Sequence, residues 1–162
     1  MEHVKTLKAA LVAFCGSLTA LFGWFGWLVI MFIGCMLIDY ITGSVAASKE
    51  GAWSSERARD GLWHKCGSLI AVIVAGIADI VIGLIVNNMP GIQLPFTYDV
   101  LICPVVVVWY ILTELGSIAE NAGKMGAPVP PFLRKIIKTL KGSADAAGEK
   151  ILPSSDDEHK DE

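Results

Sequence analysis

Three carboxylic acids lie inside or at the end of long apolar stretches: Asp39, Asp79 and Glu114. Asp79 is the one charged residue between Cys66 and Tyr98. An ionisable group at bilayer depth is costly, and it usually faces the interior of a helix bundle or a path for water. The chemistry expected of these acids is therefore polar contact between helices, or the lining of an aqueous space.

No pattern typical of an enzyme accompanies the three acids. The sequence contains no Gly-rich phosphate loop, no H-E-x-x-H and no nucleophile elbow. An intramembrane enzyme would need two carboxylates, or a nucleophile and a base, at one depth, whereas these acids are expected at different depths. Four cysteines lack C-x-x-C spacing and are interpreted as small apolar residues. We expect no enzymatic activity, no metal and no cofactor.

The composition is that of an integral membrane protein. Of 162 residues, 54% are hydrophobic and 18% are charged, and the mean hydropathy is +0.57. Basic and acidic residues are segregated, because residues 124–141 contain no acid and residues 142–162 contain seven. We predict one all-α membrane domain over residues 1–123, a basic amphipathic helix over 124–141 and a disordered, charged tail over 142–162. Nothing in the sequence favours a nucleic-acid partner.

The first apolar run is too long for one straight span. Residues 9–38 carry no charge, and as a single helix they would reach about 45 Å across a hydrocarbon core of about 30 Å. The run contains Gly23 and Gly26 with two tryptophans, which suit a turn at the membrane surface. A hairpin there predicts helices over about 6–22 and 24–42; one tilted helix is the alternative. The run is also too long for a cleavable signal peptide, so we expect the N-terminus to be retained.

The distribution of positive charge predicts the orientation. Residues 43–65 contain Lys49, Arg57, Arg59 and Lys65, whereas residues 87–99 contain no Lys or Arg. Short cytoplasmic loops are enriched in such residues. We therefore expect 43–65 to be a cytoplasmic loop and 87–99 an external one.

Two further helices are predicted, over about 66–86 and 100–121, and both termini should be cytoplasmic if the hairpin forms. The first helix, 6–22, is barely long enough to cross, so it could instead be re-entrant or interfacial. The expected fold is a small bundle of four apolar helices with three to four transmembrane spans.

The predicted helix 66–86 has a ridge of small residues on one side. Residues spaced by four fall on one helical face, and small ones let neighbouring helices approach closely in lipid. The members of this predicted oligomerisation face are Gly67, Ala71, Ala75, Asp79 and Gly83. The alternative is that Asp79 is protonated and hydrogen-bonded within one subunit.

The predicted helix 100–121 carries a polar stripe over about three turns, and this stripe is expected to line a lumen or a seam between helices. Its members are Tyr110, Glu114, Ser117, Glu120 and Asn121. The last two could instead form the wet cytoplasmic end. A depth count places Asp79 nearer the outer leaflet and Glu114 nearer the inner one, so the two should not pair within one subunit.

Two charged groups are expected on the cytoplasmic side. Asp39 should form an ion pair that anchors the adjoining loop, with Arg57, Arg59 or Lys65 as its partner. The amphipathic segment should lie on the inner leaflet through basic residues that surround its apolar face, or should pack beneath the bundle. These membrane-surface residues are Arg134, Lys135, Lys138 and Lys141.

Several stretches together carry a family likeness over about residues 35–135. They are Asp39-Tyr40-Ile41-Thr42-Gly43, the loop from Gly51 to Lys65, Asp79, Tyr110 to Glu114, Ser117 to Asn121 and Gly126 to Pro130. In these stretches the chain resembles the phage holins of the toxin secretion/phage lysis family. The resemblance implies a protein that oligomerises in the bacterial cytoplasmic membrane and forms lesions through which an endolysin, or in some systems a toxin, passes.

Two other functions remain open from the sequence. A small ion or solute channel, or a transporter subunit, would keep a narrow pore and would not pass a folded enzyme. An antiholin or membrane scaffold would bind another membrane protein and form no pore. The partners expected for the holin are the lipid bilayer, further copies of the chain, an endolysin and in some systems an antiholin.

Overall fold

The part of the chain that the structure describes is entirely helical, as predicted. The computed structural model describes residues 2–88 and 100–151, without the side chains of residues 2, 11, 14, 15 and 18–22. Within these ranges it contains no strand. The helices, in order, are α1 (Glu2–Phe22), α2 (Trp24–Lys49), α3 (Ser55–Asn88), α4 (Ile102–Lys124) and α5 (Pro131–Ile151).

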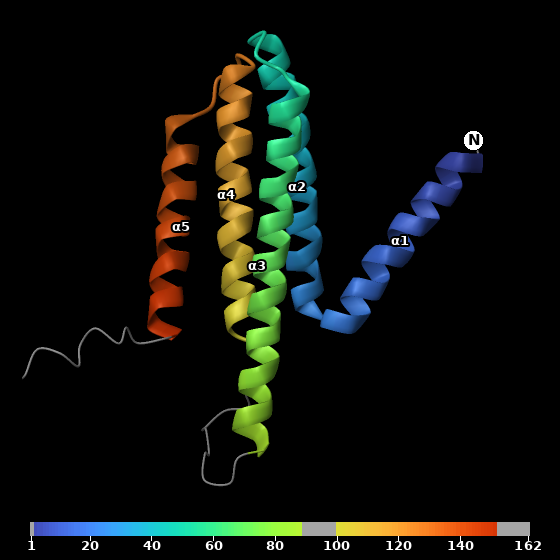
Figure 1. The fold of residues 1–162 in the computed structure, drawn as a ribbon, viewed down its shortest axis with the longest axis vertical. Helices are drawn as coiled ribbons and strands as arrows, with labels where there is room; N and C mark the ends of the chain where they lie inside the picture. The colour runs from blue at the N-terminus through green and yellow to red at the C-terminus, as the bar shows by residue number, and fades with distance from the viewer. Residues whose placement is uncertain (1, 89–99, 152–162) are drawn as a thin grey trace, which may run out of the picture.

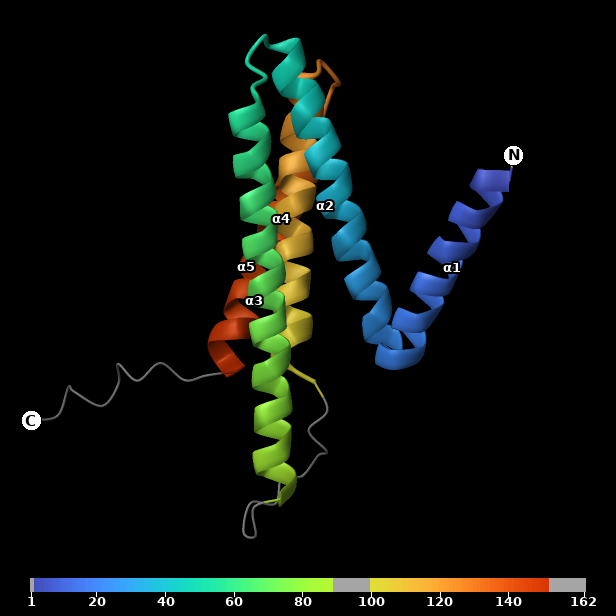
Figure 2. The same ribbon diagram turned by 45° about the vertical axis from the view of Figure 1, so that its right-hand side comes forward.

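Helix α4 is the centre of the bundle, and α2, α3 and α5 each pack against it (Figures 1 and 2). Contact between α2 and α3 is slight by comparison. Helix α1 packs on α2 and leans away from the other helices. Three of the described helices, α2, α3 and α4, are long and apolar enough to cross a membrane.

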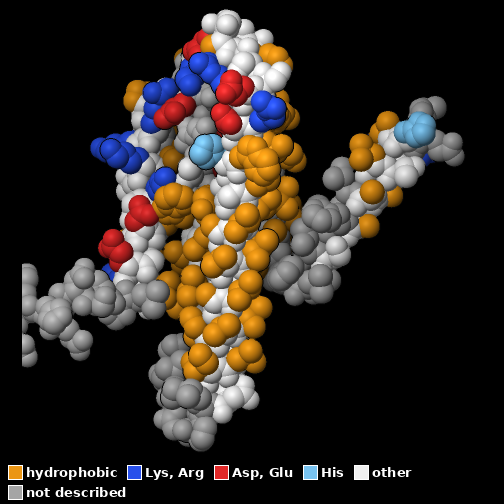
Figure 3. Space-filling view, in the orientation of Figure 1, with side chains coloured by type: hydrophobic (Ala, Val, Ile, Leu, Met, Phe, Trp, Pro, Cys, Tyr) orange, Lys and Arg blue, Asp and Glu red, His pale blue; other side chains and the backbone are white. Residues whose placement is uncertain are grey.

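The core is small and lies where α2, α3 and α4 meet. Phe32 and Val107 are fully buried there, and Phe25, Met36 and Cys103 pack around them. Most other large apolar side chains are exposed, and they cover the length of α3 away from its charged end (Figure 3). Such a surface is unusual for a water-soluble monomer but suits a helix surrounded by lipid.

The chain turns between α1 and α2 at Gly23. Its φ of +56° is a conformation that residues with a side chain rarely adopt, so glycine is required at this position. The long apolar run is therefore broken there, and it does not form one continuous tilted helix.

The segment 43–65, predicted as a loop, is largely helical. Helix α2 continues to Lys49 and α3 begins at Ser55, so only residues 50–54 connect them. The hydroxyl oxygen of Ser54 accepts a hydrogen bond from the backbone N–H of Arg57, which caps the start of α3. The prediction was wrong because it ended each helix where the apolar residues ended, although charged residues can extend a helix into water.

The C-terminal segment also differs from the prediction. Helix α5 begins at Pro131, a residue favoured in the first turn of a helix, and it continues to Ile151. Residues 142–151, which were expected to be disordered, extend the helix because they include several alanines. The remainder of the predicted tail, 152–162, and most of the predicted external loop, 89–99, lie outside the described residues.

Candidate functional site

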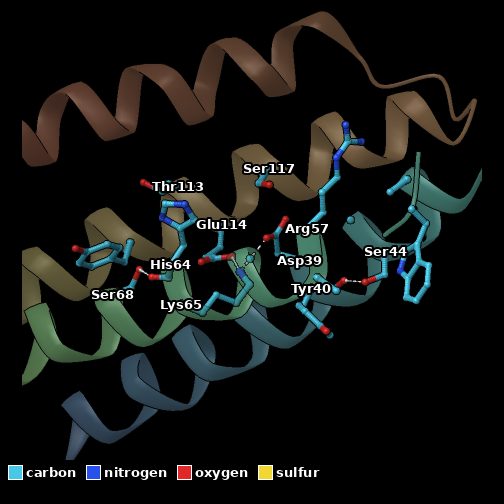
Figure 4. Close-up of a pocket in the computed structure, with 16 residues that line it drawn as sticks. Asp39, Tyr40, Ser44, Arg57, His64, Lys65, Ser68, Thr113, Glu114 and Ser117 are labelled. Carbon is cyan, nitrogen blue, oxygen red and sulfur yellow. Dashed lines mark hydrogen bonds and ion pairs between the residues drawn. The ribbon is translucent and has the colours of Figure 1, made fainter. Parts of the chain in front are cut away.

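A polar cluster joins α2, α3 and α4 near one end of the bundle (Figure 4). The ammonium group of Lys65 on α3 lies 2.8 Å from a carboxylate oxygen of Asp39 on α2 and 2.5 Å from one of Glu114 on α4. Asn121 on α4 donates hydrogen bonds to Asp39, at 3.0 Å, and to the hydroxyl oxygen of Thr42, at 3.3 Å. One lysine therefore holds three helices together.

Burial makes this cluster sensitive to the loss of any member. Only 7% of the surface of Glu114 is exposed, and Asp39 and Lys65 are partly buried. Charges removed from water are tolerated when they are paired, whereas an unpaired one costs about 3–5 kcal/mol. Removal of Lys65 would leave two carboxylates facing each other without a cation.

A cavity of about 350 Å³ opens beside the cluster. It lies between α2 and α3, where these helices contact each other little, and α4 lines its other side (Figure 4). Its wall combines the charged cluster with aromatic and hydroxyl side chains from all three helices. These further lining residues include Tyr40, Ser44, Trp53, Arg57, His64, Ser68, Tyr110, Thr113 and Ser117. Water or a polar group could occupy this space, while the described residues contain no cluster of three or more potential metal ligands.

Asp79 has a different role within the chain, because its carboxylate caps the start of α4. One oxygen accepts the backbone N–H groups of Leu101 at 3.1 Å and Ile102 at 2.9 Å, and the other accepts that of Cys103 at 2.7 Å. The first N–H groups of a helix have no partner within the helix, and lipid cannot supply one. Asp79, which is 3% exposed, supplies it from α3.

The acids therefore find their partners inside a single chain. No buried side-chain nitrogen or oxygen among the described residues lacks a hydrogen-bond partner. Contact with neighbouring copies is therefore not needed to satisfy Asp79 or Glu114. As expected, the two do not pair: Asp79 binds the start of α4, and Glu114 binds Lys65.

The structure divides the predicted small-residue ridge into two parts. Ala75 and Asp79 are buried, and the neighbouring Gly76 lies close to the sulfur of Cys103 on α4. At the other end Gly67 is exposed, and a Cβ added to it would meet no atom within 4 Å. Ala71 and Gly83 are half-buried.

The predicted stripe on α4 faces α2 and α3 of the same chain. Glu114 and Asn121 enter the cluster, and Ser117 lines the cavity. Tyr110 packs on Phe32, with the ring centroids 5.8 Å apart. Glu120 is exposed and lies beside α5 instead.

The ion pair predicted for Asp39 forms with one of the three basic residues proposed as its partner. Lys65 forms the ion pair, whereas Arg57 donates to the carbonyl oxygen of Ala52 at 2.9 Å and Arg59 is exposed. Sequence reasoning missed that Glu114 and Asn121 complete this anchor. The expectation that the acids lie at different depths was wrong for Asp39 and Glu114, because both bind the same ammonium group.

The basic residues of α5 are only partly engaged with α4. Arg134 lies against Gly123, and the Lys141 ammonium group lies 4.0 Å from the centre of the Trp109 ring. Lys135 and Lys138 are exposed. The indole N–H of Trp109 also donates to Asp145, a contact that the sequence did not predict.

Comparison with known proteins places the chain in a family. An uncharacterized protein of Halalkalibacterium halodurans is 34% identical over 88% of this chain and 97% of its own length. Uncharacterized proteins of Listeria innocua and Clostridium perfringens are 31% and 28% identical, over 81% and 80% of this chain and 84% and 87% of their own. No solved structure matches. The bacteriophage holin family matches residues 16–142, which include all three candidate spans. The chain therefore belongs to the bacteriophage holin family, whose members are non-enzymatic membrane proteins.

Proposed function

We propose that this protein oligomerises in the bacterial cytoplasmic membrane and forms lesions that release an endolysin, or a toxin, from the cell. The observation that carries the proposal is the family match over residues 16–142. The exposed apolar surface of the three candidate spans supports it, because that surface needs lipid or further copies of the chain to cover it.

In the proposed orientation the polar cluster lies at the cytoplasmic end of the bundle. Lys49, Arg57, Arg59, Lys65 and Lys124 all lie at or near this end. Basic residues are enriched on the cytoplasmic side of membrane proteins. The connections 50–54 and 125–130 would then be cytoplasmic, and Gly23 would lie at the external surface.

The arrangement of contacts suggests how a closed subunit could open. Helices α2 and α3 contact each other little, and Lys65 links them at the cytoplasmic end through Asp39. At the other end α3 is tied to α4 through Asp79. Opening would break the Lys65 contacts, keep the Asp79 cap, and turn the stripe that includes Glu114 toward water.

Assembly would use the exposed part of the small-residue ridge. Gly67 leaves room for another helix to approach, whereas Ala75 and Asp79 are already covered by α4. Once several subunits surround an opening, water would fill the space next to the polar residues of α4 that face α2 and α3 in the closed subunit.

Expression of the gene with and without a cytoplasmic endolysin tests the proposal. We expect loss of membrane potential when the protein is expressed alone, and rapid lysis only when the endolysin is also present. Loss of potential without release of the enzyme would indicate a narrow channel, and no permeability at all would indicate an antiholin or scaffold. Either result would contradict the proposed function.

A further inference from the structure

Helix α5 lies beside α4 and runs antiparallel to it (Figures 1 and 2). Arg134, near its start, reaches Gly123 at the end of α4, and Ile137 contacts Gly116. Further along, both Lys141 and Asp145 contact Trp109. Helix α5 thus extends from the charged end of the bundle toward the apolar part of α4.

The apolar face of α5 does not face α4. No residue of α5 is buried. At 100° per residue its four exposed large apolar side chains fall within about 100° of one another. Ile137, which contacts α4, lies about 40° beyond them, and the other residues that contact α4 lie on the same side. The apolar face consists of Phe132, Leu133, Ile136 and Leu140, which are between 40% and 65% exposed.

The charged part of α5 lies too deep for a membrane-embedded bundle. Lys65 is the last charged residue of α3 before its apolar stretch, and its contact with Glu114 marks the same level on α4. Trp109 is five residues nearer the start of α4, or about 7.5 Å farther into the bilayer. Lys141 and Asp145 are at this level, and Glu149 and Lys150 lie deeper still. Charges on a lipid-facing surface at such depth are strongly disfavoured.

The first part of α5 is complementary to an anionic membrane surface. Residues 124–144 contain five basic residues and no acid. Lys135 lies beside the apolar face and Lys138 on the opposite side of the helix, and both are exposed. Residues 125–130 connect α5 to the end of α4 at which the charged residues of the bundle gather (Figure 3). A helix with an apolar face and basic flanks binds the boundary between headgroups and acyl chains.

We propose that α5 leaves α4 when the bundle is inserted, and binds the anionic lipid of the cytoplasmic leaflet through Phe132, Ile136 and Leu140. The basic side chains then lie among the headgroups, and Asp145, Glu149 and Lys150 remain in water. The flank of α4 around Gly116 becomes uncovered. This proposal depends on insertion of the three spans but does not depend on the formation of lesions.

Photo-crosslinking of the full-length protein in vesicles tests the proposal. Benzoylphenylalanine is placed at Leu140 on the apolar face, at Lys135 outside that face, or at Ile137, which contacts α4. In bilayers containing phosphatidylglycerol, position 140 should form mainly lipid adducts and position 135 few. Position 137 should give little crosslink to α4. A dominant 137-to-α4 crosslink in these bilayers, or equal lipid adducts at 140 and 135, would overturn the proposal.

Charge reversal provides the matched control. The double substitution Lys135→Glu and Lys138→Glu should lower the lipid adducts at position 140 by about fivefold or more for each residue changed. Lys5→Glu with Lys8→Glu makes the same change in net charge on α1 and should leave them unchanged. Equal effects of the two pairs, or adducts at position 140 to a second protein copy in place of lipid, would reject anionic lipid as the partner.

Discussion

Lys65 is the residue on which the association of three helices depends. It is the cation between Asp39 and Glu114, and its position on α3 lets it reach both α2 and α4. The cluster has two acids and one base in a partly buried setting, so its stability depends on this one ammonium group.

We predict that Lys65→Met lowers the free energy of unfolding by about 3–5 kcal/mol, because two partly buried carboxylates lose their cation. Denaturant titration in mixed micelles measures the change. Arg59→Gln removes a positive charge from the exposed surface of the same helix and should alter stability by less than about 0.5 kcal/mol. Adding Asp39→Asn and Glu114→Gln to Lys65→Met should restore part of the loss. Equal stability of the Lys65 and Arg59 variants would refute the role assigned to the cluster.

Asp79 accepts hydrogen bonds from the backbone at the start of α4. Mutation can distinguish this capping role from a role in contact between subunits. Asp79→Leu removes the acceptor for three backbone N–H groups, each of which costs about 1–3 kcal/mol when it is buried without a partner. We expect strong destabilisation of the monomer, measured by thermal unfolding in micelles. Asp79→Asn keeps one acceptor oxygen and should be milder. If Asp79→Leu changed oligomer size but not monomer stability, the capping role would be contradicted.

At the scale of the elements, the turn between α1 and α2 depends on the backbone conformation of one residue. Gly23 has a positive φ, whereas Gly34, inside α2, is helical and has open space around it. The two glycines therefore provide a matched pair in the same apolar run.

We expect Gly23→Ala to cost about 1–3 kcal/mol, because a side chain makes this backbone conformation unfavourable. Gly34→Ala should be neutral or stabilising by up to about 1 kcal/mol, since alanine is the better helix former. Unfolding midpoints in the same detergent provide the comparison. If the two substitutions had the same effect, the turn at Gly23 would not be a requirement of the fold.

At the scale of the whole molecule, the distribution of burial limits which substitutions can report on assembly. Ala75 is buried against the rest of the chain, so a larger residue there would disturb the monomer. Gly67 has open space around it and tests contact between copies.

We therefore predict that Gly67→Leu leaves the helix content and monomer stability unchanged but reduces crosslinked oligomers and delays lysis. The reason is that a bulky side chain prevents close approach of helices. Ile70→Leu, at an exposed position on the same helix, is the control and should alter neither quantity. Normal oligomers and normal lysis timing in the Gly67→Leu variant would show that this part of α3 is not an assembly surface.

The sequence alone determined which segments form the apolar helices and which acids are exceptional, because hydropathy and charge depend only on composition along the chain. It also revealed the family through the motifs around Asp39, Asp79 and Glu114. Helix ends were predicted less well, since α2 continues beyond its apolar residues and α3 begins before its own.

Only the tertiary structure decided the partners of the acids. A depth count places Asp79 and Glu114 at different levels, but it does not reveal that α4 begins beside Asp79 or that Lys65 lies between Asp39 and Glu114. Those contacts depend on the rotation of each helix about its axis and on its neighbours. The periodicity of a single helix shows which residues share a face, but it does not show which helix that face packs against. Packing among helices that are distant in sequence decides this.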